Sequence, residues 1–292
     1  MEKEGIRYSE EDHNLFLDLY DYLYLDAQYL TDNIYPGRDM SYIYRRVNKL
    51  VKNGYVQKMK LPLQEITTNH GNTYSVYSLA KKGVEEVREL LGDHVSWDSR
   101  WTDRTPLYVY HSLMLSHISG AFRKHQHERF FLHEWISEKR AFFNYTNNAT
   151  DVIRPDGVAM IGNQQSGKTF GVLIEMERSR TRKEITRSKI LRYNAYMEGE
   201  GYLKQDVFET QPSSMRVVFV SRKENEMKRL MTHSKALTGP NGEVRETEIQ
   251  TPHVDVLYTT YDRFLEDPWG KIFWAKDALN QDSQFHIYEK IK

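Results

Sequence analysis

The chain has 292 residues and no net charge at neutral pH, with 41 Lys and Arg residues against 41 Asp and Glu residues. The net charge therefore does not indicate whether the protein binds an acidic or a basic partner. Only local clusters of charged residues can indicate this. The sequence contains no cysteine, which excludes disulfide bonds, thiolate zinc sites and a cysteine nucleophile.

The beginning of the chain carries no sign of a targeting segment. Residues 1–12 (MEKEGIRYSEED) are charged and contain no apolar run of signal-peptide length. No later stretch approaches the roughly 20 apolar residues of a membrane helix. Together with the missing cysteines, these features predict a cytoplasmic protein that does not enter the membrane.

The length favours two compact domains, of which the first is expected over residues 1–95. It begins with a helix that Ser9 can cap and whose leucines form a broad apolar face. A second, short helix is expected over residues 26–35, because Pro36 and Gly37 form a strong stop signal.

A third helix follows that stop signal and is strongly basic. Asp39 or Ser41 can cap it, its apolar side chains recur at helical spacing, and Gly54 follows its end. From Arg38 to Lys60 there are seven basic residues and one acidic residue. Such a basic stripe on a neutral chain indicates contact with a nucleic-acid backbone.

Two strand-like runs come next, at residues 56–63 and 73–79, with a polar turn region between them at residues 69–72. A helix over residues 81–91 then ends at Gly92. This order is typical of a winged helix-turn-helix, in which the third helix enters the major groove of DNA and the hairpin is the wing. The alternative is a fold of this kind that serves protein contacts, with solvated basic residues.

On the first interpretation, the third helix contacts DNA in two ways. Its first residues are candidates for base edges, and its basic residues are candidates for phosphates. The base-edge candidates are Ser41 and Tyr42, and the phosphate candidates are Arg45, Arg46, Lys49 and Lys52. A homodimer is a further expectation, because winged-helix proteins often dimerise.

Residues 96–292 are expected to form the second domain, beginning with a helix over residues 107–124. Its two histidines, His111 and His117, are six positions apart and so do not share one helical face. This spacing favours a packing or capping role over a shared metal ion.

The segment 157–177 allows two structures. Residues 162–169 (GNQQSGKT) match a phosphate-binding loop, in which Lys168 would reach the terminal phosphates of a nucleotide. Such a loop must open a helix, whereas the residues after Thr169 are a glycine-bearing run of β type. An antiparallel hairpin with its turn at NQQSG is therefore favoured over a nucleotide-binding loop.

The hairpin would gather acidic residues at its open end. Asp156 precedes its first strand, and Glu175 and Glu177 lie two positions apart, and so on one face, in its second strand. These three carboxylates are the predicted metal ligands, since oxygen donors suit Mg²⁺ or Mn²⁺. Such a cation would polarise a scissile phosphate and lower the pKa of a bound water.

The sequence around these acids resembles known proteins. Arg154-Pro155-Asp156, Glu175-Met176-Glu177 and the later Lys189 are similar to the PD-(D/E)XK nuclease arrangement. The whole chain resembles the replication-relaxation family of bacterial plasmids and integrative elements, through RRVNKLVKNGYV, HSLMLSHISGAF, WISE, PDG, IEMERS, SKILRYNAY and VLYTTYDRFLEDPWGKIFW in this order. The resemblance implies an α+β protein with an N-terminal winged helix-turn-helix followed by a restriction-endonuclease-like α/β domain.

The resemblance also implies roles for single residues. Glu138 would match an early acidic residue of the nuclease core, Asp156 the Asp of the PD pair, and Glu175 the acidic residue of the next strand. Glu177 stands where a standard nuclease has its lysine, so Lys189 on the following helix would supply the ammonium group.

A second basic run begins beside the predicted carboxylates. From Arg178 to Arg192 there are seven basic residues and one acidic residue, Glu184. The residues expected to hold a DNA backbone are Arg178, Arg180, Arg182, Lys183 and Arg187. The expected partner is double-stranded DNA, and single-stranded DNA at an origin is a second expected partner.

Three functions follow from these features. The resemblance implies a DNA-binding protein of a mobile element that processes an origin in plasmid replication or transfer, which in chemical terms is metal-dependent DNA nicking, as by a relaxase. The alternative is a non-catalytic regulator or accessory factor, which the glutamate at position 177 favours. The third function is a P-loop nucleotide-binding protein, which depends on Lys168.

Overall fold

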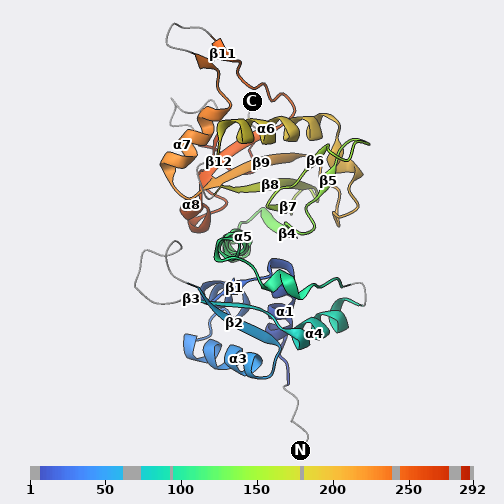
Figure 1. Ribbon diagram of the computed structural model, residues 1–292, viewed down its shortest axis with the longest axis vertical. Coiled ribbons are helices and arrows are strands. Elements are labelled where there is room, and N and C mark those ends of the chain that lie inside the picture. Colours follow the sequence, from blue (N-terminus) through green and yellow to red (C-terminus); the bar gives the residue numbers. More distant parts are fainter. Residues whose placement is uncertain are drawn as a thin grey trace, which may run out of the picture. The chain divides into compact units, whose positions relative to one another are not determined.

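The computed structural model describes residues 7–61, 74–92, 95–177, 181–238, 244–275 and 284–289 (Figure 1). The chain is an α+β protein that divides into two compact units, residues 1–120 and 121–292. Over the part of the chain that the structure describes, no helix has both the length and the apolar character that a membrane crossing requires.

The first unit is built mainly of helices. They are α1 (Glu10–Tyr22), α2 (Ala27–Tyr29), the π-helix η1 (Leu30–Ile34), α3 (Met40–Lys52), α4 (Lys81–Leu91), the 3₁₀ turn η2 (Ser99–Thr102) and most of α5 (Pro106–Lys124). Ser9 caps α1 in a reciprocal capping box with Asp12, and Asp39 caps α3 through the backbone N–H of Tyr42. Gly54 follows α3 with φ +81°, a left-handed conformation that glycine adopts without strain. The expected helix starts and stops are therefore confirmed.

A small antiparallel sheet accompanies these helices. Its strands are β1 (Leu25–Asp26), β2 (Val56–Leu61) and β3 (Tyr74–Leu79), in the order β1-β3-β2. β2 and β3 pair from Val56 opposite Leu79 to Leu61 opposite Tyr74. The two expected strands therefore form a hairpin, while the expected turn region at residues 69–72 lies outside the described residues.

Helix α5 explains why the first unit extends to Gly120 and does not end near residue 95. Val109 and Leu113 belong to one apolar cluster with Tyr24 and residues of the small sheet. The hydroxyl groups of Ser119 and Tyr22 are 2.5 Å apart. Trp97 and Trp101, which precede α5, pack against the same cluster. The larger part of α5 therefore belongs to the first unit.

The second unit contains a six-stranded mixed sheet in the order β13-β12-β9-β8-β7-β4. The strands are β4 (Phe130–Ser137), β7 (Gly157–Asn163), β8 (Thr169–Glu177), β9 (Met215–Ser221), β12 (Asp255–Thr260) and β13 (Trp274–Ala275). β8, β9 and β12 run parallel to one another. β7 is antiparallel to β8, β4 is antiparallel to β7, and β13 is antiparallel to β12. The middle strands β7, β8 and β9 are buried over almost their whole length, and most of their residues are apolar.

Helices and short strands make up the rest of the second unit (Figure 1). They are β5 (Phe143–Asn144), β6 (Val152–Ile153), α6 (Lys183–Glu198), η3 (Gly201–Lys204), α7 (Glu224–His233), β10 (Leu237–Thr238), β11 (Val244–Glu246) and α8 (Tyr261–Glu266). α6 and α7 cover one face, where Ile190 and Met227 share a core with Leu173 and Phe219 of the sheet. On the other face of β9, the Arg216 guanidinium donates to the backbone carbonyl of Ile287.

The segment 157–177 is a β-hairpin, as the sequence favours. β7 and β8 pair from Gly157 opposite Ile174 to Gly162 opposite Thr169. In the turn, the Asn163 side chain accepts hydrogen bonds from two backbone N–H groups, and Gly167 takes φ +66°. Because a strand and not a helix begins at Thr169, the expectation of a nucleotide-binding P-loop is wrong.

Candidate active site

Acidic residues gather at the open end of the β7–β8 hairpin. Gly157 pairs with Ile174, so Asp156 and Glu175 are the next residues on neighbouring strands. The backbone N–H of Asp156 donates to Ile174 (2.9 Å), and its Oδ2 accepts from the N–H of Met176 (2.7 Å). Glu175 and Glu177 point to the face that α6 covers, because they alternate in step with the core residue Leu173.

Helix α6 brings Lys189 to this cluster. Its Nζ donates to Oε2 of Glu175 at 2.6 Å and to Oε1 of Glu177 at 3.1 Å. The two carboxylates are buried, whereas the Lys189 side chain is 34% exposed. The cluster is therefore open to a ligand from the Lys189 side.

Two further residues complete the hydrogen bonds, and neither is among the site residues predicted from the sequence. The Tyr193 hydroxyl donates to Oε1 of Glu175, and the Thr181 hydroxyl donates to Oε2 of Glu177. Tyr193 lies four positions after Lys189, the spacing that places two side chains on one face of a helix, and this signal could have identified it. Thr181 follows the strand end without any comparable pattern.

Arg229, a residue of α7, holds Thr181 in place. Nη1 of Arg229 donates to the backbone carbonyl of Thr181 at 2.9 Å. Arg229 thus holds the residue whose hydroxyl group donates to Glu177. Nothing in the sequence near Arg229 points to this role, since it lies 48 positions from Thr181.

Burial and neighbouring charges shift the pKa values in the cluster. Burial raises the pKa of Glu175 to about 7; the Lys189 ammonium opposes this rise, and the Asp156 carboxylate adds to it. Burial alone would lower the pKa of Lys189, but Glu175 and Glu177 outweigh it and raise that pKa. Burial also raises the pKa of Tyr193 well above its usual range, so this hydroxyl keeps its proton and donates.

Glu138 lies at the same end of the sheet as Asp156. Strand β4 ends at Ser137, which pairs with Gly157, so Glu138 and Asp156 each adjoin this last pair. The side chain of Glu138 is exposed, whereas Glu175 and Glu177 are buried. Of the five predicted catalytic residues, the structure therefore brings Asp156, Glu175, Glu177 and Lys189 together and places Glu138 on the nearby surface.

The carboxylate cluster has the oxygen donors that a hard divalent cation prefers. Within the described ranges, no group of three or more His, Asp and Glu side chains is arranged as a metal site. The Lys189 ammonium group is paired with both Glu175 and Glu177. Asp156 and Glu175 supply oxygen donors that suit Mg²⁺ or Mn²⁺. Because Lys189 is paired with Glu175 as well as with Glu177, a cation would have to replace its ammonium group on Glu175.

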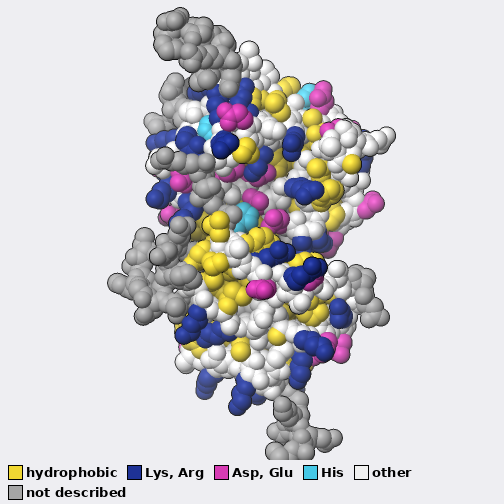
Figure 2. Space-filling view, viewed as in Figure 1, with side chains coloured by type: hydrophobic (Ala, Val, Ile, Leu, Met, Phe, Trp, Pro, Cys, Tyr) yellow, Lys and Arg dark blue, Asp and Glu magenta, His cyan; other side chains and the backbone are white. Residues whose placement is uncertain are grey.

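The basic residues of α3 differ in whether their side chains are exposed and so able to contact DNA. Arg45, Lys49 and Lys52 are exposed, and Figure 2 shows Lys and Arg side chains over this part of the first unit. Ser41 is exposed as well, and Tyr42 is half-buried beneath Arg38, whose Cζ lies 5.2 Å from its ring.

Arg46 is the exception among the α3 residues. Its Nε donates to Oδ1 of Asp12 at 2.9 Å, and the Asp12 side chain is fully buried. The expectation that Arg46 meets a phosphate therefore needs correction, because its guanidinium neutralises a buried carboxylate.

The basic residues at the start of α6 also differ in exposure and in their partners. Arg182 is exposed at the start of α6, and Lys183 is half-buried. Arg187 donates to the backbone carbonyls of His233 (3.0 Å) and Thr247 (2.7 Å), so it ties α6 to the neighbouring segments. The expected contacts of Arg178 and Arg180 lie outside the described residues.

His117 of α5 also has a defined partner. Its Nε2 lies 2.8 Å from Oδ2 of Asp26; the Asp26 side chain is fully buried and the His117 side chain is 10% exposed. His117 therefore has a packing partner in Asp26 of the first unit.

A comparison with protein families identifies this chain. The family model described as replication-relaxation matches residues 16–210. The chain belongs to the replication-relaxation family. The match begins within α1 and ends after η3, and thus includes α3, the β7–β8 hairpin and α6. Every predicted site residue of this family member lies inside the matched range.

The solved structures offer one distant likeness. The chain is similar to the restriction endonuclease FokI with a TM-score of 0.30 and 12% sequence identity, over 91% of this chain and 45% of FokI. The chain thus spans less than half the length of that structure. A comparison with curated proteins gives no match.

Proposed function

We propose that this replication-relaxation protein nicks DNA of a mobile element at an origin, in plasmid replication or transfer, and that the cluster of Asp156, Glu175 and Lys189 is its nicking site. The observation that carries the proposal is the meeting of two carboxylates from a β-hairpin with an ammonium group from the next helix at one end of a mixed sheet. Neither the family match nor the likeness to FokI assigns these residues.

Each residue has a chemical task in this proposal. A divalent cation held by Asp156 and Glu175 would polarise the scissile phosphate and activate a water. The Lys189 ammonium binds the phosphate and stabilises the negative charge that develops on it during cleavage. Glu177 and Tyr193 hold this lysine and Glu175 in position through their hydrogen bonds.

The first unit delivers the DNA in this proposal. α3 would enter the major groove as the recognition helix of a winged helix-turn-helix, and the β2–β3 hairpin would be the wing. Arg45, Lys49 and Lys52 would contact phosphates, because they are exposed, while Ser41 and Tyr42 at the start of the helix would meet base edges. Arg182 at the start of α6 would hold the backbone near the cluster.

A nicking assay tests the proposal. Supercoiled plasmid that carries the DNA next to the protein's own coding sequence is incubated with the full chain and increasing Mg²⁺ or Mn²⁺. We expect nicked circles with the wild-type protein and at least a hundredfold slower nicking with Asp156→Asn, since one general acid–base or metal-held group contributes about 10² to 10⁴ in rate. The amide oxygen of the asparagine can still accept from the Met176 N–H.

Lys168→Ala is the matched control. Lys168 is exposed in the turn at the opposite end of the same hairpin, so this variant should nick like the wild-type protein and should bind DNA equally well. Loss of nicking in Lys168→Ala together with Asp156→Asn would point to a general loss of the fold and not to this site.

A non-catalytic regulator is the second candidate function, and one observation favours it. Glu177 stands where a standard nuclease of the PD-(D/E)XK type has its lysine, and the Lys189 ammonium is paired with both Glu175 and Glu177. If the wild-type protein binds the origin DNA but leaves every duplex and single strand intact at all metal concentrations, the regulator replaces the nickase.

A further inference from the structure

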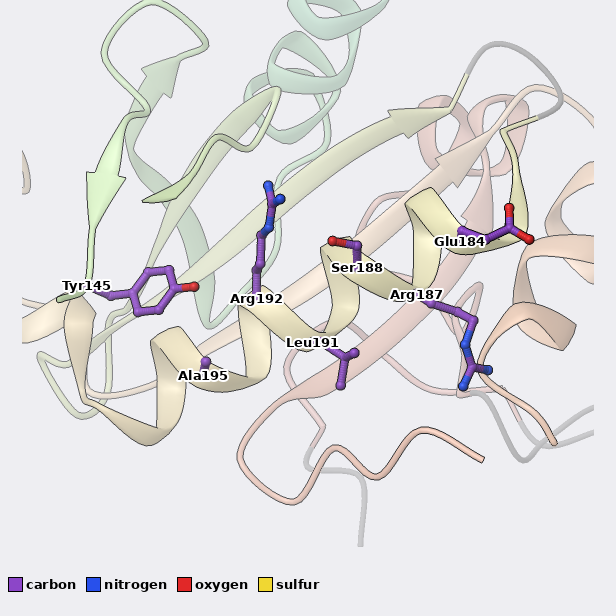
Figure 3. A pocket seen from close by; sticks show the side chains of 7 residues that line it. All are labelled: Tyr145, Glu184, Arg187, Ser188, Leu191, Arg192 and Ala195. Atoms are coloured by element: carbon purple, nitrogen blue, oxygen red, sulfur yellow. The ribbon is translucent and has the colours of Figure 1, made fainter. Parts of the chain in front are cut away.

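A shallow groove of about 480 Å³ lies on the outer face of α6, the face turned away from the sheet (Figure 3). Ser188, Leu191 and Ala195 form its floor on the helix. Tyr145, from the loop that follows β5, stands at one end, where Figure 3 shows its ring directed along the helix towards Arg192. The groove is thus assembled from two elements of the second unit.

The groove has an aromatic and apolar part that is accessible. Leu191 is 50% exposed, so its apolar side chain is accessible in the groove. The Tyr145 ring is half-buried and is held in place by an edge-to-face contact with Tyr196 at 6.2 Å between centroids. A fixed aromatic ring beside an exposed leucine offers a surface on which a flat, apolar ring can stack.

Positive charge lies at the same end of the groove as Tyr145. Arg192 is exposed, and Figure 3 shows it next to the Tyr145 ring, whereas Glu184, the carboxylate of the lining, lies at the opposite end. Arg187 adds positive charge, and its guanidinium also binds backbone carbonyls. An aromatic ring next to a cation matches a base and its phosphate.

The groove adjoins the proposed nicking site through α6. Lys189 and Arg192 are three positions apart and so are neighbours on the helix surface. β6, the strand that leads through Arg154 to Asp156, packs against this same helix. A strand whose phosphate reaches Lys189 can therefore continue past Arg192 to Tyr145.

We propose that this groove binds single-stranded DNA next to the nicked phosphodiester, with one base stacked on Tyr145 and a phosphate on Arg192. The position of the strand relative to the cut rests on the proposed function. The new element is that the DNA in the groove is single-stranded. A paired base cannot stack on a protein ring, because its faces are covered within the duplex.

The test measures binding without cleavage. The full chain is titrated against a short fluorescent single-stranded oligonucleotide of mixed sequence, in EDTA, and the anisotropy is followed at several salt concentrations. We expect Tyr145→Leu to weaken binding roughly tenfold, because the base has no aromatic ring on which to stack. We expect Arg192→Ala to reduce the slope of log K against log salt by about 0.7, which corresponds to one phosphate neutralised on a single strand.

Two controls show whether a loss of binding is specific to the groove and to single-stranded DNA. Lys168→Ala removes one exposed positive charge at the far turn of the hairpin and should leave single-strand binding unchanged. A duplex of the same sequence should bind Tyr145→Leu as well as it binds the wild-type protein. Because Arg192 is exposed and its truncation disturbs no core, Arg192→Ala keeps the test valid even if Tyr145→Leu fails to fold.

The outcomes separate this inference from the proposed function. If both variants bind the single strand as the wild-type protein does, or lose duplex and single strand equally, the groove is not a single-strand site, whatever the nicking assay shows. If single-strand binding falls in both variants while the wild-type protein never nicks, the binding site stands and the nickase does not.

Discussion

Nζ of Lys189 lies 2.6 Å from Oε2 of Glu175, although Lys189 belongs to α6 and Glu175 to β8, an inner strand of the mixed sheet. The lysine reaches the carboxylate at the edge of the core, where Glu175 is buried and the lysine stem is partly exposed. This ion pair links the proposed chemistry of the second unit to its stability, so both can be tested with the same variants.

Lys189→Ala should abolish nicking and destabilise the second unit. Removing the ammonium leaves the buried Glu175 carboxylate without its cation, which costs about 3–5 kcal/mol for a fully buried pair. Because the Lys189 side chain is 34% exposed, we expect a smaller loss of about 2 kcal/mol in the free energy of unfolding. Denaturant unfolding measures it, and the double variant Lys189→Ala, Glu175→Gln should recover most of the loss. No recovery would show that the two side chains are not coupled.

Glu175 should make the stability depend on pH. Its pKa is raised from 4.5 to about 7 in the folded protein, so the folded state binds the proton more tightly than the unfolded chain does. The stabilising contribution is therefore complete below about pH 4.5 and is lost as the pH rises through about 7. The difference in unfolding free energy between the wild-type protein and Glu175→Gln, measured from about pH 4 to about pH 8, should follow this course. A difference that stays constant with pH would contradict the raised pKa.

Arg46→Ala should weaken the first unit. The Asp12 carboxylate is fully buried, and Arg46 is its cationic partner, so truncation should cost about 2–3 kcal/mol in the free energy of unfolding. Thermal unfolding checks this loss. Lys49→Ala, one turn further along α3 and exposed, is the matched control and should leave the midpoint unchanged. Equal stability of the two variants would show that the Arg46–Asp12 pair contributes nothing.

Lys49→Ala should instead change DNA binding. Each duplex phosphate that is no longer neutralised by a lysine reduces the slope of log K against log salt by about 0.9. The same reduction is expected for Lys52→Ala, and twice that reduction for the double variant. Titrations of a duplex at several salt concentrations measure the slopes. Unchanged slopes in both variants would remove α3 from the DNA-contacting surface.

The sequence was sufficient to predict most elements and the core of the candidate site. The capping residues Ser9 and Asp39, the glycine after α3 and the β-type run after Thr169 are short-range signals, and the structure follows each of them. The hairpin then places Asp156 beside Glu175 by its register alone, because paired strands leave no freedom in which residues are neighbours.

Only the tertiary structure decided which partners the charged side chains take. Arg46 and Lys49 look alike in the sequence, yet Arg46 donates to buried Asp12 of α1, whereas Lys49 is exposed. The support that Arg229 gives Thr181 and the extension of the first unit to Gly120 likewise depend on contacts between distant segments. Local backbone preferences are determined by neighbouring residues, whereas burial and ion pairing are determined by the packing of the whole unit.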